Sequence, residues 1–367
     1  MKGRSETGGW LRTGSEGLEE QPAHSRTAAG LRAFFLGEIP HRPKRFLFFL
    51  IGLFLSLLTL YLALREIDLS AAGRALLSAD RAWIGLALLS VAINTLGKAV
   101  RWKELLGEAG ERVGLGSCLS ALLVGQMLNT LAPVRLGDLS RAYLLGGLGP
   151  GRSFTLGGVF LEKLIDLFAY SLLSCLLILL APLPDWLDSS AAPLLGVRAL
   201  GASAVPLITS RTEQVRKLLA QLLRLLPGRL CAYLLPRFEA GLNSVEVLSG
   251  WAAVFRLSLW TALVWGTAVL TNHLVLRALG LHLPWTASLL VLIVLQAGIS
   301  LPSGPGRIGI FEWICILSLA VFAIDRQPAF SFGILLHAIV LLPTTLLGVV
   351  CAWSFNLYRR RNGHRTP

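Results

Sequence analysis

Charged residues are scarce in this chain. Only 15% of its 367 residues are charged, whereas 54% are hydrophobic and the mean hydropathy is +0.65. A soluble domain carries about 25% charged residues. The composition therefore excludes an ordinary soluble domain and predicts an all-α polytopic membrane protein.

Cysteine is also scarce, and the common catalytic motifs are missing. None of the five cysteines forms a CxxC pair, which excludes a disulfide or zinc framework. There is no P-loop lysine motif, no HExxH and no GxSxG. Gly304, Gly306 and Gly309 have the GxGxxG spacing, but no strand pattern precedes them. We therefore expect no cofactor and no metal, and the sequence does not favour an enzyme.

Positive charge is in excess, with a net charge of +13. The Lys and Arg residues lie mostly between apolar runs, and they form no basic patch interleaved with aromatic residues. This pattern excludes nucleic acid as a partner and indicates cytoplasmic loops facing anionic headgroups. Residues 1–45 are polar and predict a disordered cytoplasmic tail. The apolar run that begins at Phe46 is too late and too long for a signal peptide, so it predicts a retained first span.

Residues 46–358 are predicted to form the membrane domain, and apolar runs mark its spans. The predicted spans are 46–64, 82–97, 154–180, 194–209, 251–276, 289–301, 311–324 and 330–358. Residues 65–81 are expected to form a loop. The cationic and aromatic stretch after Gly97, with Arg101 and Trp102, predicts an interface anchor. The basic segment 211–250 predicts an interfacial helix, and 359–367 a basic cytoplasmic tail.

Counting crossings predicts a hairpin at 113–148. If 113–131 crossed the membrane, the acidic loop 182–193 would lie inside and the basic segment 211–250 outside, against the positive-inside rule. A segment that enters from the cytoplasm and returns restores every loop to its expected side, with Pro133 and Gly137 at its turn. About eight transmembrane helices and one or two re-entrant hairpins follow, in the cytoplasmic membrane, with both termini inside.

The turn of this hairpin is unusually polar for a membrane span. Arg135, Asp138 and Arg141 follow Asn129 within a few positions. One interpretation is an interface loop with a local ion pair. We favour an anion clamp, in which the arginines bind a phosphate and Asp138 fixes their geometry.

A second break repeats the first. Residues 133–137 and 305–309 both read Pro-x-Arg-aliphatic-Gly, and an acid follows each one, as Asp138 and Glu312. Such paired breaks indicate a transporter-like binding site between two halves; coincidence in a chain rich in Gly and Pro is the alternative. The region 285–324 fits either a hairpin from outside or two full crossings.

Glu162 and Asp166 are four residues apart and so share a helix face. Arg141 and Lys163 are candidate partners for them in a structural ion pair. A catalytic acid and base on a lipid-linked substrate is the other interpretation.

Taken together, these motifs resemble the lysylphosphatidylglycerol synthase transmembrane (flippase-like) family. The resemblance covers residues 45–356 and rests on four elements, which are Asn129-x-x-x-Pro133-x-Arg135-x-Gly137-Asp138-x-x-Arg141, Arg101-Trp102, Glu162…Asp166, and Pro302…Pro305-Gly306…Gly309…Glu312. It implies an integral membrane protein that acts on lipids. The aminoacyltransferase domain of the full-length synthases has no counterpart in these residues. Lys163 and Arg307 depart from the usual Arg and Gly.

These observations predict a protein that binds and translocates an anionic phospholipid or a polyprenyl-linked sugar. We expect Asn129, Arg135, Asp138, Arg141, Glu162, Asp166, Arg307 and Glu312 to form the substrate site. Pro133, Gly137, Pro302, Pro305, Gly306 and Gly309 would shape the breaks. The alternatives are a membrane-embedded enzyme and a scaffold for a partner synthase or glycosyltransferase.

Overall fold

The computed structural model describes residues 43–132, 136–180, 251–298 and 303–362, together with the isolated Lys217 and Gln221. The chain forms two units, 1–47 and 48–367. Of the first unit, only the start of one helix is among the described residues. Helices, turns and short connections make up all of the described residues.

Four helices are long and apolar enough to cross a membrane, and a bent pair makes a fifth candidate. The four are α4 (Arg81–Leu105), α8 (Arg152–Leu180), α12 (Trp251–Ala278) and α15 (Arg326–Asn362). The pair is α2 (Pro43–Leu64) and α3 (Leu69–Leu77), with a bend of 82° between them. The prediction of a polytopic helical membrane protein is confirmed, whereas eight spans are not. The predicted span 194–209, the interfacial segment 211–250 and nearly all of both tails lie outside the described residues.

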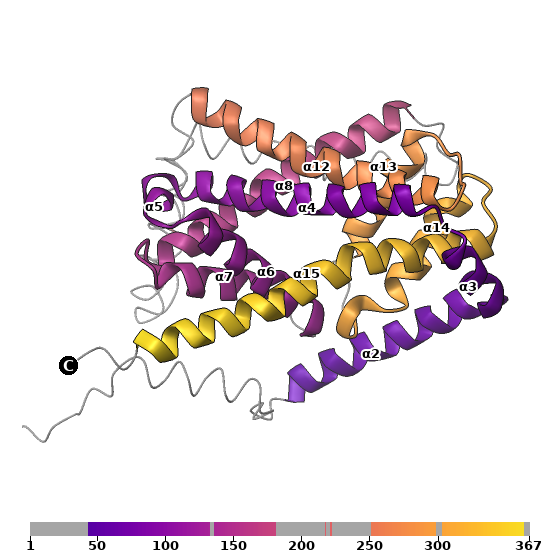
Figure 1. Ribbon diagram of the computed structural model, residues 1–367, viewed down its shortest axis with the longest axis horizontal. Helices are drawn as coiled ribbons and strands as arrows, with labels where there is room; N and C mark the ends of the chain where they lie inside the picture. Colours follow the sequence, from indigo (N-terminus) through magenta and orange to yellow (C-terminus); the bar gives the residue numbers. More distant parts are fainter. Residues whose placement is uncertain are drawn as a thin grey trace, which may run out of the picture. The chain divides into compact units, whose positions relative to one another are not determined.

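Helices α4 and α12 pack antiparallel along their whole length (Figure 1). At one end the amide of Asp80 donates to the carbonyl of Ala278 over 2.9 Å. At the other end Arg256 pairs with Glu104 at 3.1 Å. We call the first the α3 end and the second the α5 end, because α3 precedes α4 and the short α5 (Gly107–Arg112) follows it.

The first hairpin enters this bundle from the α5 end. Helix α6 (Leu115–Leu131) follows α5, and α7 (Gly137–Gly146) returns directly to the start of α8. The two helices touch where Gly125 faces Gly137, since a Cβ on Gly137 would overlap the carbonyl oxygen of Gly125. Only glycine permits this contact.

The second hairpin enters from the opposite end. Helix α13 (Trp285–Gly298) follows the end of α12, and α14 (Ile310–Ala320) leads into the start of α15. Their 14 and 11 residues span about 21 and 17 Å, well short of a hydrocarbon core of about 30 Å. The hairpin interpretation of 285–324 is therefore favoured over two full crossings.

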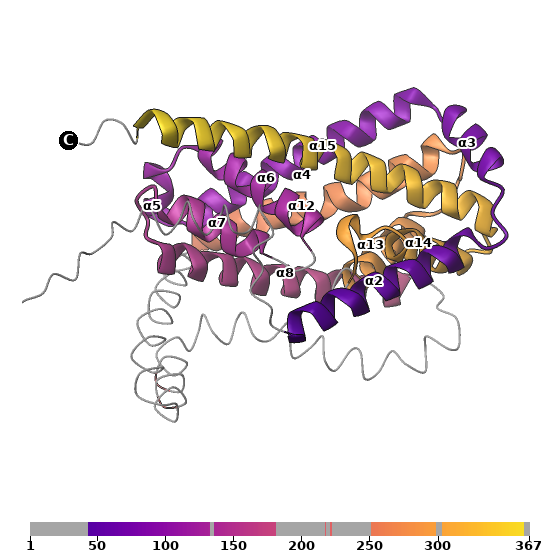
Figure 2. The same ribbon diagram turned by 90° about the horizontal axis from the view of Figure 1, so that it is seen from below.

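The two hairpins meet inside the bundle. The turn of the second, η2 (Pro305–Arg307), packs against α6, the first limb of the other. Figures 1 and 2 show α6 and α7 near α5, and α13 and α14 near α3. The second break thus meets the first limb of the hairpin that enters from the opposite end.

Two predictions about the start of the chain need correction. The predicted loop 65–81 contains α3, which the carboxylate of Asp68 caps by accepting from the amide of Ser70. The second span does not stop at Gly97 but continues as α4 to Leu105. Arg101 and Trp102 are consequently buried, at 1% and 0% exposure, and do not form an interface anchor. They are buried because α8 supplies carboxylate partners for Arg101.

Candidate functional site

Arg101 of α4 is paired with two carboxylates of α8. Its Nη1 lies 2.7 Å from Oδ1 of Asp166, and its Nη2 lies 3.3 Å from Oε1 of Glu162. The second of these contacts is fully buried, since the two side chains are only 1% and 5% exposed. Thr261 of α12 also lies within 3.5 Å of Nη1. A buried cation in the last turns of α4 is thereby compensated.

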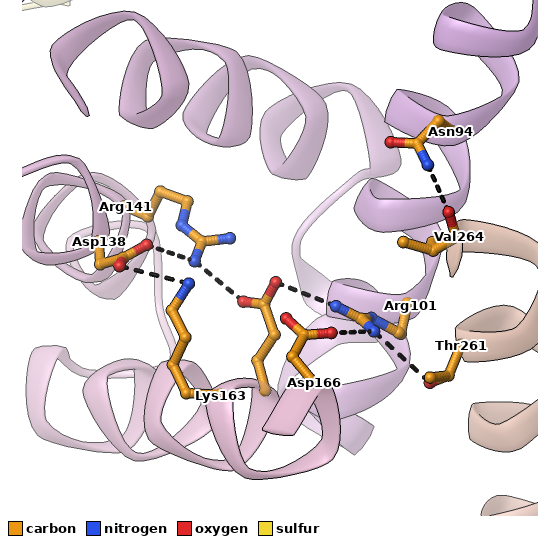
Figure 3. A network of polar contacts seen from close by, with 9 residues as sticks. Asn94, Arg101, Asp138, Arg141, Lys163, Asp166, Thr261 and Val264 are labelled. Atoms are coloured by element: carbon orange, nitrogen blue, oxygen red, sulfur yellow. Dashed lines mark hydrogen bonds and ion pairs between the residues drawn. The ribbon is translucent and has the colours of Figure 1, made fainter. Parts of the chain in front are cut away.

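Arg141 of α7 pairs with the other carboxylate oxygen of the same Glu162 and with Asp138, which Figure 3 shows beside it. Its Nη2 lies 2.9 Å from Oε2 of Glu162 and 2.8 Å from Oδ1 of Asp138. The guanidinium also stands 4.9 Å from the ring centroid of Trp102, a cation–π contact. Lys163 lies 3.4 Å from Oδ2 of Asp138 and is half exposed. Glu162 therefore joins α4, α7 and α8.

We call Arg101, Asp138, Arg141, Glu162, Lys163 and Asp166 the ion network. Its three cations and three carboxylates are mutually paired. Lys98, one turn before Arg101, adds a fourth cation near Asp166 and Glu162. Among the described residues it has no hydrogen bond or ion pair. Nor do these residues contain a group of His, Cys, Asp or Glu that could hold a metal ion.

The first break is fixed by a side chain of α6. Oδ1 of Asn129 accepts the amide of Gly137 over 2.8 Å, which caps the start of α7. A Cβ on Gly125 would lie 2.7 Å from Cγ of Arg141, so glycine there also makes room for the ion network. Pro133 and Arg135 lie outside the described residues.

The second break has three residues with positive φ. Gly306, Arg307 and Gly309 have φ of 73°, 57° and 90°. The amide of Gly304 donates to Oγ of Ser56 over 2.8 Å, and Gly309 lies directly on the backbone of α2. Arg307 is half buried and has an interaction of its own. Pro302 lies outside the described residues, whereas Pro305 opens η2.

The side chain of Glu312 is hydrogen-bonded to the backbone at the end of this break. Its Oε2 accepts the amide of Gly309 over 2.7 Å, and its Oε1 lies 2.6 Å from Nδ1 of His337 on α15. Glu312 is only 3% exposed. Unlike the carboxylates of the ion network, it has no Lys or Arg partner among the described residues.

Comparison with known proteins agrees with this architecture. The family model of the lysylphosphatidylglycerol synthase TM region matches residues 49–348. The chain belongs to this family. The match includes both hairpins and the whole ion network.

A curated relative is the glycosyltransferase AglD of Haloferax volcanii. It is 25% identical over 362 residues, covering 89% of this chain and 57% of the relative. The chain thus spans little more than half the length of that protein. No solved structure matches it.

In the structure, the predicted site residues that are described fall into two groups. Asn129, Asp138, Arg141, Glu162 and Asp166 lie in or beside the ion network, and Arg307 and Glu312 lie at the second break. Arg101 was missed as a site residue, although a single arginine within a long helical pattern of apolar residues could have indicated it. Lys163 was expected beside Glu162 or Asp166 and instead pairs with Asp138.

Proposed function

We propose that this protein binds an anionic lipid or lipid-linked sugar and moves it across the cytoplasmic membrane. The observation that supports this most directly is the pair of half-length hairpins that enter from opposite ends and meet at η2 and α6. Broken helices in corresponding positions of two halves are the usual setting of a transporter binding site.

The breaks suit a phosphate-bearing headgroup. Helix α7 begins at Gly137 and α14 at Ile310, so each hairpin points a helix N-terminus toward the other. The positive ends of helices attract anions. Arg135 and Arg307 precede these two helix starts by a few residues in the sequence. We assign the headgroup to this region between the breaks.

The ion network would then act as a positioning device rather than as the headgroup site. Arg141 and Glu162 are buried and already paired with charged partners. Breaking a buried pair leaves an uncompensated charge, so a lipid phosphate would not readily displace either partner. The network instead holds α7 against α4 and α8, which fixes the first break.

The distribution of charge supports an orientation. At the α5 end, α4 ends near Lys103 and α5 near Arg112, and α8 begins at Arg152. Arg42 precedes α2 and Lys44 and Arg45 lie in its first turn, and the last turn of α15 contains Arg359, Arg360 and Arg361. By the positive-inside rule the α5 end faces the cytoplasm, with both termini on that side.

The pairing also argues against a catalytic role for Glu162 and Asp166. A general acid and base need a proton-accepting carboxylate with room for substrate, whereas both side chains are engaged by Arg101. The name of the Haloferax relative supports a place beside a synthase or glycosyltransferase that makes or uses the transported lipid. Such an enzyme is the protein partner we propose.

Liposomes test the transport. The protein is reconstituted with fluorescent phosphatidylglycerol, and the fraction of lipid protected from a membrane-impermeant quencher is followed in time; a fluorescent polyprenyl-phosphate sugar is the second substrate. We expect wild-type protein to move one of them, and Arg135→Ala to move it at least tenfold more slowly, about 1.4 kcal/mol of activation.

The matched control is Arg256→Ala, which removes an arginine from the exposed pair with Glu104. It should move lipid like the wild type. If Arg135→Ala folds and transports as well as Arg256→Ala, the headgroup does not bind at the first break. If the wild type moves neither lipid, the protein is a scaffold.

A further inference from the structure

The pair formed by Glu312 and His337 differs from every other buried ionisable contact in the described residues. The arginines of the ion network keep their charge at any accessible pH. In contrast, both members of this pair exchange protons, and their nearest atoms are 2.6 Å apart. At that distance a proton must lie between Nδ1 and Oε1, because two acceptors would repel each other.

Among the residues that the structure describes, few charged groups surround the pair. Glu312 is 4% exposed as a side chain and His337 12%. The sequence of α13 contains no ionisable residue, and α2 contributes only the exposed Tyr61 beyond Phe46. Cys315 is the other titratable group that senses Glu312. Arg326 of α15 stands over Trp313, and Arg307 lies on η2 with an interaction of its own.

Two protonation states are compatible with this geometry. With one proton on Nδ1 the imidazole is neutral, Glu312 is ionised, and the pair carries one negative charge beside the N-terminus of α14, which favours a carboxylate. With a second proton, on Nε2 of His337 or on Glu312, the pair is neutral. A net charge is costly inside a membrane. The neutral pair can therefore move away from the N-terminus of α14 at a lower free-energy cost than the negatively charged pair.

The pair is connected to the second break by a direct bond. Oε2 of Glu312 accepts the amide of Gly309, whose φ of 90° and contact with α2 hold the end of η2 in place. Phe311 precedes Glu312 in the first turn of α14, and its ring stacks on that of His337 with the ring centroids 4.3 Å apart. A change of charge on the pair therefore acts on the backbone that closes the break.

We propose that Glu312 and His337 form a proton-binding site that couples proton uptake to movement of the second hairpin. The ligand is one proton per cycle, taken up when the hairpin must leave the backbone of α2 and released when it returns. This rests on the transport proposed above, but its first test does not depend on lipid movement.

The first test is a titration of the whole protein in lipid nanodiscs. ¹⁵N-histidine NMR identifies the imidazole of His337 by its loss in His337→Gln. We expect this signal in the wild type to change as a proton is taken up over the pH range in which the protein stays folded. Glu312→Gln keeps the size of the side chain and an acceptor for Gly309, and it should shift or abolish that change.

The matched control is His273→Gln, which alters another buried histidine, bonded to Ser288 and Arg277 and without a carboxylate partner in the described part of the chain. It should leave the His337 titration unchanged. A wild-type signal that is constant over this range, or one that titrates identically in Glu312→Gln, overturns the proposal. Should Glu312→Gln not fold, the wild-type titration alone decides.

The second test uses liposomes with an imposed pH difference. The gradient should change the initial rate of lipid movement at least tenfold in the wild type, and should change it less than twofold in His337→Gln. Lipid movement that ignores the gradient overturns the coupling while transport stands. A protein that titrates but moves no lipid retains the proton site and loses the proposed transport function.

Discussion

Arg141 and Glu162 lie 2.9 Å apart, and their side chains are only 4% and 5% exposed. They come from α7 and α8, and Glu162 is shared with Arg101 of α4. One carboxylate thus connects the first hairpin to two membrane-length helices. Helix α7 packs on α6 and α8, and this connection holds the start of the returning limb against the bundle.

Glu162→Gln should be strongly destabilising. The amide cannot neutralise Arg101 and Arg141, and removing one partner of a buried ion pair costs about 3–5 kcal/mol. The measurement is the free energy of unfolding in detergent, taken from a denaturant titration. The control is Glu104→Gln, whose pair with Arg256 is partly exposed and should contribute about 1 kcal/mol or less. Equal stabilities of the two variants would mean that the ion network does not support the fold.

The sequence predicted the helices better than the contacts between them. Apolar runs marked α2, α8, α12 and α15 to within a few residues, since bilayer thickness fixes their length. The crossing count predicted a hairpin at 113–148, and the short helices α6 and α7 occupy that stretch. The end of α4 was wrong for a physical reason. Arg101 is compatible with a buried helix only because α8 supplies carboxylates 61 and 65 residues later, and no local pattern encodes such partners.

Because α6 and α7 pack closely at Gly137, replacing this glycine should destabilise the protein, whereas replacing Gly85 should not. Gly137→Ala would place a methyl group on the carbonyl oxygen of Gly125, where backbone must move, and should cost about 3 kcal/mol. Gly85→Ala, in α4, meets nothing within 4 Å and should stabilise by about 0.5–1 kcal/mol through helix propensity. Unfolding in detergent measures both. A Gly137→Ala protein as stable as Gly85→Ala would contradict the observed packing of α6 on α7.

Replacing Lys98 should weaken lipid binding without lowering the stability of the fold. It is a half-buried cation without an ion pair among the described residues, close to a network whose own charges are balanced. An unpaired charge is costly in this setting, so Lys98→Met should leave the unfolding free energy unchanged or raise it. If the cation helps to attract an anionic headgroup, the same variant should bind phosphatidylglycerol several-fold more weakly. Native mass spectrometry with defined lipid measures the binding. Strong destabilisation by Lys98→Met would show that the lysine has a structural partner.

The proposed orientation predicts which end of the bundle a membrane-impermeant reagent can reach from outside the cell. Ser78 and Glu111 are both exposed, the first at the α3 end and the second at the α5 end. In a background without the five native cysteines, Ser78→Cys should react with a membrane-impermeant maleimide in intact cells. Glu111→Cys should react only after the cells are permeabilised. The opposite pattern would place the basic end outside, and with it the first hairpin would open away from the cytoplasm. Transport would then have to begin at the second hairpin, whose Glu312 and His337 would face the cytoplasmic side.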